Sequence, residues 1–223
     1  MPTRNNIQIV FAHLPEEERD VERSAAKEFA LRTAEIVRDE ARAAGGDARC
    51  DVKISPLAEW KKDQLFAPTA PLSPNDESDD NNVINTQNTT VVFLISCGPD
   101  GSVHRSVRKT TKWIKEQENK IKSDDKGNES DKSPTTTTTT TCVVALLGHS
   151  VCKTSAEQME DEVFSAGRRL AKSLQGFMAA TQSSFQPPTA TTQKFVLETH
   201  VELEPPEEKF DGWVESWASL LQK

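Results

Sequence analysis

The residue pair most suggestive of chemistry is His149 and Cys152, which follow the apolar run Cys142–Gly148. A cysteine acts as a nucleophile when an imidazole lies within hydrogen-bond reach of its sulfur, and nearness along the chain does not supply that contact. An ordinary loop histidine beside a half-buried thiol is therefore the preferred interpretation. His13, His104 and His149 would share one edge of a sheet, but their spacing matches no metal motif.

The four cysteines show no CxxC spacing. Cys97 and Cys142 lie in or beside apolar runs, where a free thiol behaves as a small hydrophobe. This predicts a reducing, cytoplasmic compartment and no cysteine-based metal site. The chain also lacks GxxxxGK and GxGxxG, so nucleotide hydrolysis and dinucleotide binding have no support. No apolar run approaches the ~20 residues that cross a bilayer, so no membrane association is expected.

Charge is unevenly spread over a chain whose formal net charge is −8, a value that disfavours a general nucleic-acid role. The segment Arg105–Lys122 is nevertheless basic, whereas Glu16–Glu22, Asp76–Asp80 and Glu202–Asp211 are acidic. The basic segment could contact RNA phosphates or an acidic protein partner. A solvated helix face is the plainer interpretation.

Strand-like and helix-like segments alternate along the chain, which predicts an α/β fold with right-handed crossovers and helices on both faces of a parallel sheet. The expected strands are Ile7–Ala12, Cys50–Ile54, Thr90–Ser96, Cys142–Gly148 and Phe195–Val201. The expected helices are Ser24–Ala44, Pro56–Phe66, Ser102–Gln117, one capped by Thr154 or Ser155, and one from Pro205 through Leu221.

The whole chain, residues 1–223, is expected to form one domain carrying long inserts. Three segments, at about 63–90, 117–141 and 183–193, have polar or low-complexity composition and bury too little apolar surface to offset the entropy of ordering them. The second of them ends in seven consecutive threonines, Thr135–Thr141. We expect all three inserts to be disordered.

Short motifs in the expected order resemble the flavodoxin-like FMN domain shared by diflavin reductases and the N-terminal part of tRNA wybutosine-synthesising (4-demethylwyosine synthase) proteins. The motifs are VVFLISCGPDG with the following Trp113-Ile114, ALLGH at Ala145–His149, Leu57-Ala58-Glu59-Trp60, and the pair Phe210 and Trp213. The wybutosine proteins are the nearer branch, because they too carry extra sequence before the fourth strand. The resemblance implies a flavodoxin-like three-layer sandwich, a five-stranded sheet of order 2-1-3-4-5, and FMN used for one-electron transfer.

Ligands of such sheets lie outside the carboxyl ends of the strands, here the loops His13–Arg23, Cys97–Ser102 and Gly148–Thr154. The family's phosphate loop reads S/T-x-T-G-x-T, whereas this first loop has no Gly or Thr and is acidic. Arg19 and Arg23, with Ser24, could clamp a phosphate. A solvated acidic loop that starts a helix is the preferred interpretation.

The other two loops lack the aromatic platforms that would stack on a flavin, and the chain contains no tyrosine. In the second loop, Gly98 stands at the family's tyrosine position between Cys97 and Gly101. In the third, His149 replaces the family's asparagine after Gly148, and Cys152 lies near its tyrosine position. The second loop is read as a strand-to-helix turn rather than a vestigial ligand loop.

Two hypotheses follow. The first is a flavodoxin-like domain with a degraded FMN site, binding no FMN or binding it weakly, that serves as a non-catalytic module for a protein partner. The alternative is an FMN-dependent electron carrier that supports an iron–sulfur or radical enzyme, as in tRNA wybutosine synthesis. The residues that would line the FMN site are Arg19, Arg23, Ser24, Cys97, Gly98, Gly101, Gly148, His149 and Cys152.

Overall fold

The computed structural model describes residues 4–15, 17, 24–43, 50–62, 87–98, 100–124, 138–148, 164–184, 192–202 and 207–218. Within these ranges the strands are β1 (Arg4–Ala12), β2 (Cys50–Pro56), β3 (Gln87–Cys97), β4 (Thr138–Gly148) and β5 (Thr192–Glu202). The helices are α1 (Ala25–Ala43), α2 (Arg105–Asp124), α4 (Ser165–Ser184) and α5 (Glu207–Ala218).

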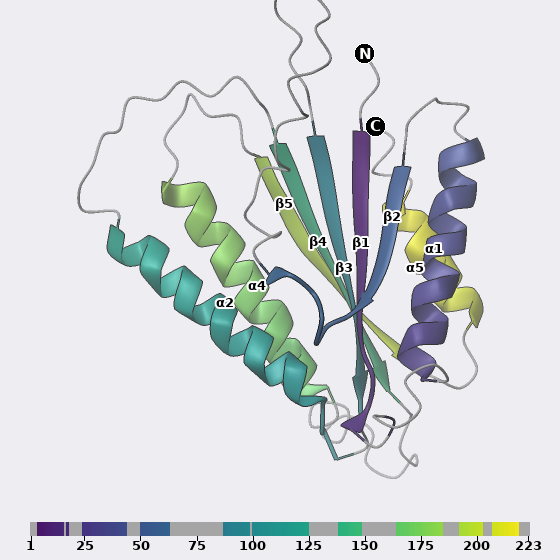
Figure 1. Cartoon of the computed structure of the whole chain (residues 1–223), viewed down its shortest axis with the longest axis horizontal. Helices are drawn as coiled ribbons and strands as arrows, with labels where there is room; N and C mark the ends of the chain where they lie inside the picture. The colour runs from purple at the N-terminus through teal and green to yellow at the C-terminus, as the bar shows by residue number, and fades with distance from the viewer. Residues whose placement is uncertain are drawn as a thin grey trace, which may run out of the picture.

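The strands form one parallel sheet in the order β2-β1-β3-β4-β5 (Figure 1). The predicted order is confirmed across β2-β1-β3-β4, and β5 lies beside β4 with a register irregularity between Thr141 and Cys142. The chain reverses its direction of winding between β1 and β3, as in doubly wound sheets of the flavodoxin-like type. The expected α/β class and flavodoxin-like fold are therefore confirmed by the topology.

The central strands are nearly continuous apolar runs because both of their faces are covered. Val91–Ile95 of β3 and Cys142–Leu147 of β4 are fully buried, as expected for strands of a parallel sheet enclosed by helices. Alternate side chains point to opposite faces. Phe93 and Ile95 therefore belong to one core, and Val92 and Leu94 belong to the other.

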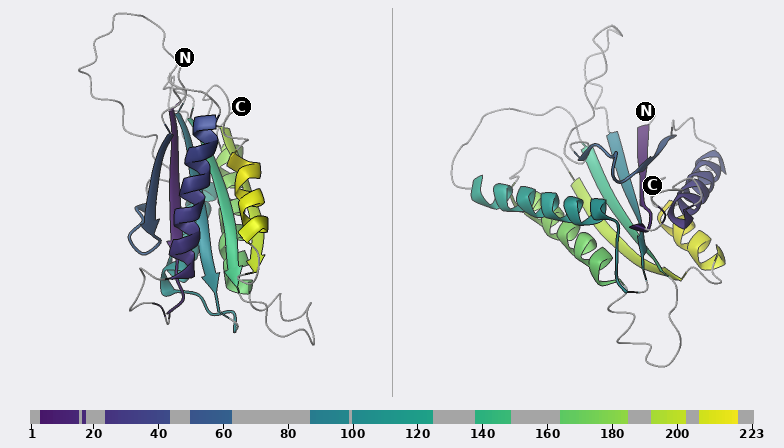
Figure 2. Two further views of the ribbon diagram at one scale, coloured as in Figure 1. Left: turned by 90° about the vertical axis from the view of Figure 1, so that its right-hand side faces the viewer. Right: turned by 60° about the horizontal axis from the view of Figure 1, so that its bottom comes forward.

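Among the described helices, two cover each face of the sheet (Figures 1 and 2). Helices α2 and α4 lie on one side, over the core that contains Phe93, and α1 and α5 lie on the other. Trp60 adds to the first core, where its ring meets that of Phe93 edge-on with centroids 5.3 Å apart. The result is the expected three-layer arrangement.

Helix α1 begins where expected, because Ser24 caps it: the backbone N–H of Lys27 donates to Ser24 Oγ at 3.3 Å. Small side chains on its buried face let it lie close to the sheet. Arg32 ties α1 to α5 by donating two hydrogen bonds to Asp211, at 2.5 and 2.6 Å. These hydrogen bonds hold the pKa of Asp211 below its usual value.

The prediction of a helix over Pro56–Phe66 is wrong for the residues that are described. Strand β2 continues to Pro56, and the backbone N–H of Leu57 donates to Phe11 O at 2.7 Å, which extends the pairing with β1. Leu57–Glu59 form a tight turn that brings Trp60 back over the sheet. The burial of Leu57 and Trp60 explains the apolar spacing that suggested a helix.

The helix predicted over Ser102–Gln117 begins later and ends later than expected, at Arg105 and Asp124. It begins at Arg105 because His104, the residue before it, accepts the backbone N–H groups of Ser106 and Val107 in the first turn. Helix α4 is described from Ser165, so the predicted cap at Thr154 or Ser155 lies outside the described residues, as do Pro205 and the end of the last helix at Leu221.

Helices and strands reach further into the expected inserts than their composition indicated. Helix α2 extends to Asp124, β3 starts at Gln87, and α4 and β5 occupy Ser183–Ser184 and Thr192–Gln193. Thr138–Thr141 of the threonine tract belong to β4, because β-branched side chains suit an extended strand. The remainder of each insert lies outside the described residues.

Among the helices of the described ranges, none combines the length and the apolar character that crossing a membrane requires.

Candidate functional site

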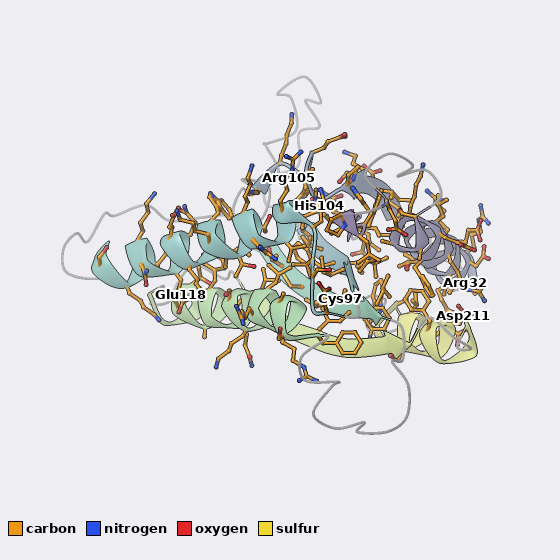
Figure 3. All side chains as sticks on the ribbon, turned by 90° about the horizontal axis from the view of Figure 1, so that it is seen from below. Arg32, Cys97, His104, Arg105, Glu118 and Asp211 are labelled. Atoms are coloured by element: carbon orange, nitrogen blue, oxygen red, sulfur yellow. The ribbon has the colours of Figure 1, made fainter. Side chains whose placement is uncertain are left out.

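The edge of the sheet formed by the carboxyl ends of the strands is where a ligand would bind in this fold, at the β1/β3 switch point. Figure 3 views this edge, with Cys97 at the end of β3 and His104 and Arg105 at the start of α2. His13 follows directly after β1. The switch point is therefore framed by the loop after β1 and the loop between β3 and α2.

Two histidines, one from each of these loops, contact each other across the switch point. The ring centroids of His13 and His104 are 4.5 Å apart and their planes are inclined by 36°. Both side chains are buried, each with 5% of its surface exposed. The two loops are thus held together at the place where the fold usually leaves a crevice.

His104 also forms the start of α2. Its carbonyl accepts the N–H of Val107 at 3.0 Å, and its Nδ1 accepts the N–H of Ser106 at 3.3 Å. Ser106 Oγ lies 2.7 Å from the same Nδ1. These contacts fix the ring of His104 and hence the surface that His13 meets.

The loop from Gly98 to Ser102 satisfies its own backbone donors. The N–H of Gly98 donates to Ser102 O at 2.8 Å, and that of Gly101 donates to Gly98 O at 2.9 Å. The N–H of Ser102 donates to Asp100 Oδ1 at 2.9 Å. Hydrogen bonds from Ser102 hold the pKa of the exposed Asp100 below its usual value, so this loop presents a carboxylate.

The backbone requires glycine at Gly101, and a side chain at Gly98 would displace the hydroxyl of Ser102. Gly101 has φ 74°, in the left-handed region that residues with a side chain rarely adopt. A Cβ at Gly98 would lie 2.4 Å from Ser102 Oγ. The pattern is that of a closed strand-to-helix turn.

In the described part of the first loop, two polar groups that could meet a phosphate are already engaged in hydrogen bonds. Glu17 accepts the N–H of Leu14 through Oε2 at 2.8 Å, so a carboxylate sits directly after β1. Ser24 is buried and its Oγ caps α1. The predicted phosphate clamp, Arg19 and Arg23, lies outside the described residues.

The third loop is described only at Gly148, which ends β4 and pairs with Cys97 of β3. His149 and Cys152 lie outside the described residues, so the interpretation of an ordinary loop histidine beside a half-buried thiol stays a prediction. Among the residues with described positions, no group of three or more His, Cys, Asp or Glu is arranged to hold a metal ion.

The thiol of Cys97, a predicted site residue, is buried and unreactive. Burial raises the pKa of the Cys97 and Cys142 thiols to about 12 in each case. Cys97 Sγ also donates to Ile95 O at 3.7 Å. At pH 7 the thiolate is then about one part in 10⁵, which leaves neither cysteine competent as a nucleophile.

We therefore expect iodoacetamide at neutral pH to leave Cys97 and Cys142 unmodified in the folded protein and to modify both after unfolding in guanidinium. Peptide mass spectrometry measures the labelling of each site. Modification of Cys142 but not Cys97 in guanidinium would point to residual structure rather than to burial. Rapid alkylation of Cys97 without denaturant would contradict the closed turn described above.

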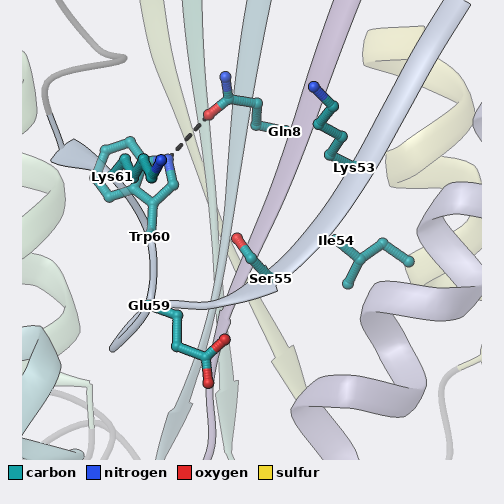
Figure 4. Close-up of a pocket in the computed structure, with 7 residues that line it drawn as sticks. All are labelled: Gln8, Lys53, Ile54, Ser55, Glu59, Trp60 and Lys61. Carbon is teal, nitrogen blue, oxygen red and sulfur yellow. Dashed lines mark hydrogen bonds between the residues drawn. The ribbon is translucent and has the colours of Figure 1, made fainter.

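A separate cavity of about 320 Å³ lies at the β2 edge of the sheet, away from the switch point (Figure 4). Trp60 and Gln8 form one wall, joined by a buried hydrogen bond from Trp60 Nε1 to Gln8 Oε1 at 2.9 Å. Lys53, Glu59 and Lys61 also line the cavity. The hydrogen bond from Trp60 satisfies the side-chain oxygen of Gln8, a buried polar residue of β1.

Sequence reasoning placed His13 and His104 at the same edge of the sheet but did not predict that they touch. The signal was their position, directly after one strand and directly before a helix. It also missed Arg169 of α4, which lies opposite the basic helix α2 and lines a groove with it. Nothing in the sequence indicates which face of α4 would meet α2.

No family model matches the sequence, and no curated protein matches it. Similar solved structures include a mutant of flavodoxin from Pseudomonas aeruginosa, at 14% identity over 98% of this chain and 99% of that chain, with a TM-score of 0.46. A flavodoxin from Streptococcus pneumonia TIGR4 is 13% identical over 96% and 95% of the two chains, with a TM-score of 0.38.

A flavodoxin from Fusobacterium nucleatum, bound to flavin mononucleotide, is 9% identical over 97% of this chain and 96% of that chain, with a TM-score of 0.41. At these identities and TM-scores the similarities carry no inference about a ligand. The fold is assigned from the strand order and the register of the sheet.

Proposed function

We propose that this chain is a flavodoxin-like domain that does not work through FMN and instead acts as a non-catalytic module that binds a protein partner. The observation that carries the proposal is the contact between His13 and His104 across the β1/β3 switch point. FMN occupies this switch point in proteins of the fold. A flavin ring would need these two buried imidazoles to separate.

The residues around the switch point also do not fit the rest of FMN. A phosphate dianion is held by hydroxyls and free backbone N–H groups at a helix start. Here the N–H of Leu14 and the N–H of Ser102 already donate to carboxylates, of Glu17 and Asp100. Added negative charge would repel the phosphate rather than neutralise it.

Stacking platforms are missing as well. The chain has no tyrosine, and the position of the family's tyrosine is Gly98, where a Cβ would meet Ser102 Oγ at 2.4 Å. Each aromatic contact contributes about 0.5–1.5 kcal/mol beyond burial. Losing two platforms together with the phosphate cradle removes the main sources of FMN affinity.

The test is the visible spectrum of the purified protein followed by titration with FMN, monitored by quenching of flavin fluorescence. We expect a colourless protein and no saturable quenching in excess FMN, because the switch point is closed. A flavodoxin stripped of its FMN and treated identically provides the positive control. A yellow protein, or saturable quenching at one FMN per chain, would overturn the proposal.

The alternative function is an FMN electron carrier that supports an iron–sulfur or radical enzyme, such as that of tRNA wybutosine synthesis. The strand order favours it, because the three loops meet at the edge where this fold binds FMN. The chain has no CxxxCxxC cluster, so the radical chemistry would belong to another protein. The FMN titration separates the two functions.

A further inference from the structure

The two helical layers carry opposite charge. Helix α2 has seven basic and three acidic side chains, and α4 has three basic and no acidic ones. On the other face of the sheet, α1 has four of each, and α5 has one basic and four acidic side chains. Within the described parts of a chain whose net charge is −8, the face formed by α2 and α4 is therefore positive.

A groove of about 700 Å³ runs between these two helices. Four of its lining side chains are cationic: Arg108, Lys112, Lys115 and Arg169. All four are exposed to solvent. The lining contains one acidic side chain, Glu116, whose Oε1 lies 3.9 Å from Lys112 Nζ, and an exposed pair at this distance offsets little of the charge.

We propose that this groove binds an acidic helical segment of a partner protein. The inference rests on the proposed function, since it assigns the surface through which the module would act. Arg108, Lys112 and Lys115 recur at i, i+4 and i+7, so they line one face of α2 over about 10 Å. A helix with carboxylates at the same spacing would place one opposite each cation.

The walls of the groove are fixed before a partner arrives. Val107 and Ile114 of α2 are buried in the core beneath it. Further along, the side chain of Glu118 of α2 packs against Gly176 of α4, where a Cβ would lie 3.0 Å from Glu118 Oε1. A preformed groove of this kind lowers the entropic cost of binding.

The lining favours an acidic protein over a nucleic acid. Sites for single-stranded nucleic acid combine cations with aromatic side chains on which bases stack. Among the described residues that line this groove, none has an aromatic side chain. The half-buried Thr111 and Ala166 instead provide small apolar contacts along the groove, as in grooves that receive an amphipathic helix.

The test uses fluorescence anisotropy of a labelled, alanine-rich helical peptide with glutamates at i, i+4 and i+7. A matched peptide with glutamines at the same positions and a single-stranded RNA oligonucleotide are the comparison probes. The groove variant is Lys112→Glu with Lys115→Glu. The matched control is Lys109→Glu with Lys120→Glu, which makes the same change of charge at exposed positions of the same helix outside the groove.

We expect wild-type protein to bind the glutamate peptide, and the groove variant to bind it at least about tenfold more weakly at low salt, because like charges then face each other. The control variant should lie within about threefold of wild type, because its reversed charges stand outside the groove and are largely screened. Circular dichroism and thermal melting verify that both variants are folded.

An equal loss of affinity for the glutamate peptide in the two variants would contradict binding in the groove, because it would show attraction to overall charge alone. If the protein bound the RNA tightly and the groove variant did not, the partner would not be an acidic protein. Equal binding of the glutamate and glutamine peptides would also contradict an acidic partner. No binding of the glutamate peptide by wild type also overturns the inference. These outcomes leave the proposed function standing, because FMN titration of the same protein tests it separately.

Discussion

Replacing Phe93 by alanine is expected to lower the free energy of unfolding by about 3–5 kcal/mol, the range for deleting a buried aromatic ring. Phe93 lies in β3, in the middle of the sheet, and is fully buried. Its ring meets that of Trp60 at right angles, so the cavity would open beneath the turn that holds Trp60 in place. Urea denaturation followed by circular dichroism measures the change.

Phe93→Leu is the control for this prediction. Leucine keeps most of the buried apolar volume and should cost less than about 1.5 kcal/mol. Similar losses for the two variants would show that the ring contact, not the volume, stabilises this region. A loss below about 1 kcal/mol in Phe93→Ala would contradict the packing described here.

Trp60→Phe and Trp217→Phe should lower the free energy of unfolding by different amounts, although both rings are buried. Trp60 Nε1 donates to Gln8 Oε1, and the phenylalanine variant would leave that buried oxygen without its donor. Trp217 Nε1 is buried with no hydrogen-bond acceptor among the described residues. We expect Trp60→Phe to cost about 2–4 kcal/mol and Trp217→Phe about 0–1 kcal/mol, because an unmade buried hydrogen bond carries a penalty of about 1–3 kcal/mol.

Each variant serves as the control for the other, since the atoms removed are the same. Parallel urea titrations give the difference directly. A double variant, Trp60→Phe with Gln8→Leu, should recover part of the loss, because it removes the stranded oxygen as well. Equal costs for the two single variants would contradict the assigned hydrogen bond to Gln8.

The sequence predicts the strands of this fold well, because burial on both faces imposes continuous apolar runs. The continuous apolar runs at residues 91–95 and 142–147 are enough to predict two buried strands, and both runs are fully buried. The cap of α1 at Ser24 could also be predicted, because a serine directly before a segment with helical apolar spacing is a local signal for the start of a helix. Local rules failed where long-range pairing decided the structure. Pro56 ends an edge strand and Leu57 starts the turn after it, because Pro56 pairs with Phe11 and the N–H of Leu57 donates to Phe11 O.

The rule that ligands bind at the carboxyl ends of strands predicts the loops in which a site is expected. His13 and His104, from the first two of these loops, do lie beside each other at that edge. Whether those loops stay apart depends on side chains such as His13 and His104, which are 91 positions apart and meet only through the fold. The groove between α2 and α4 likewise depends on how two helices lie side by side, and charge spacing on one helix does not reveal it.

The threonine tract has a consequence for how this gene can vary. Of the seven threonines at 135–141, four are paired in β4 opposite Gln87–Thr90, and the apolar residues from Cys142 onward fix the register. If a codon were gained or lost within the repeat, another threonine would take the vacated place in the strand. The repeat can therefore shorten by up to three codons, or lengthen, over generations without changing the residue types in the described pairs between β3 and β4.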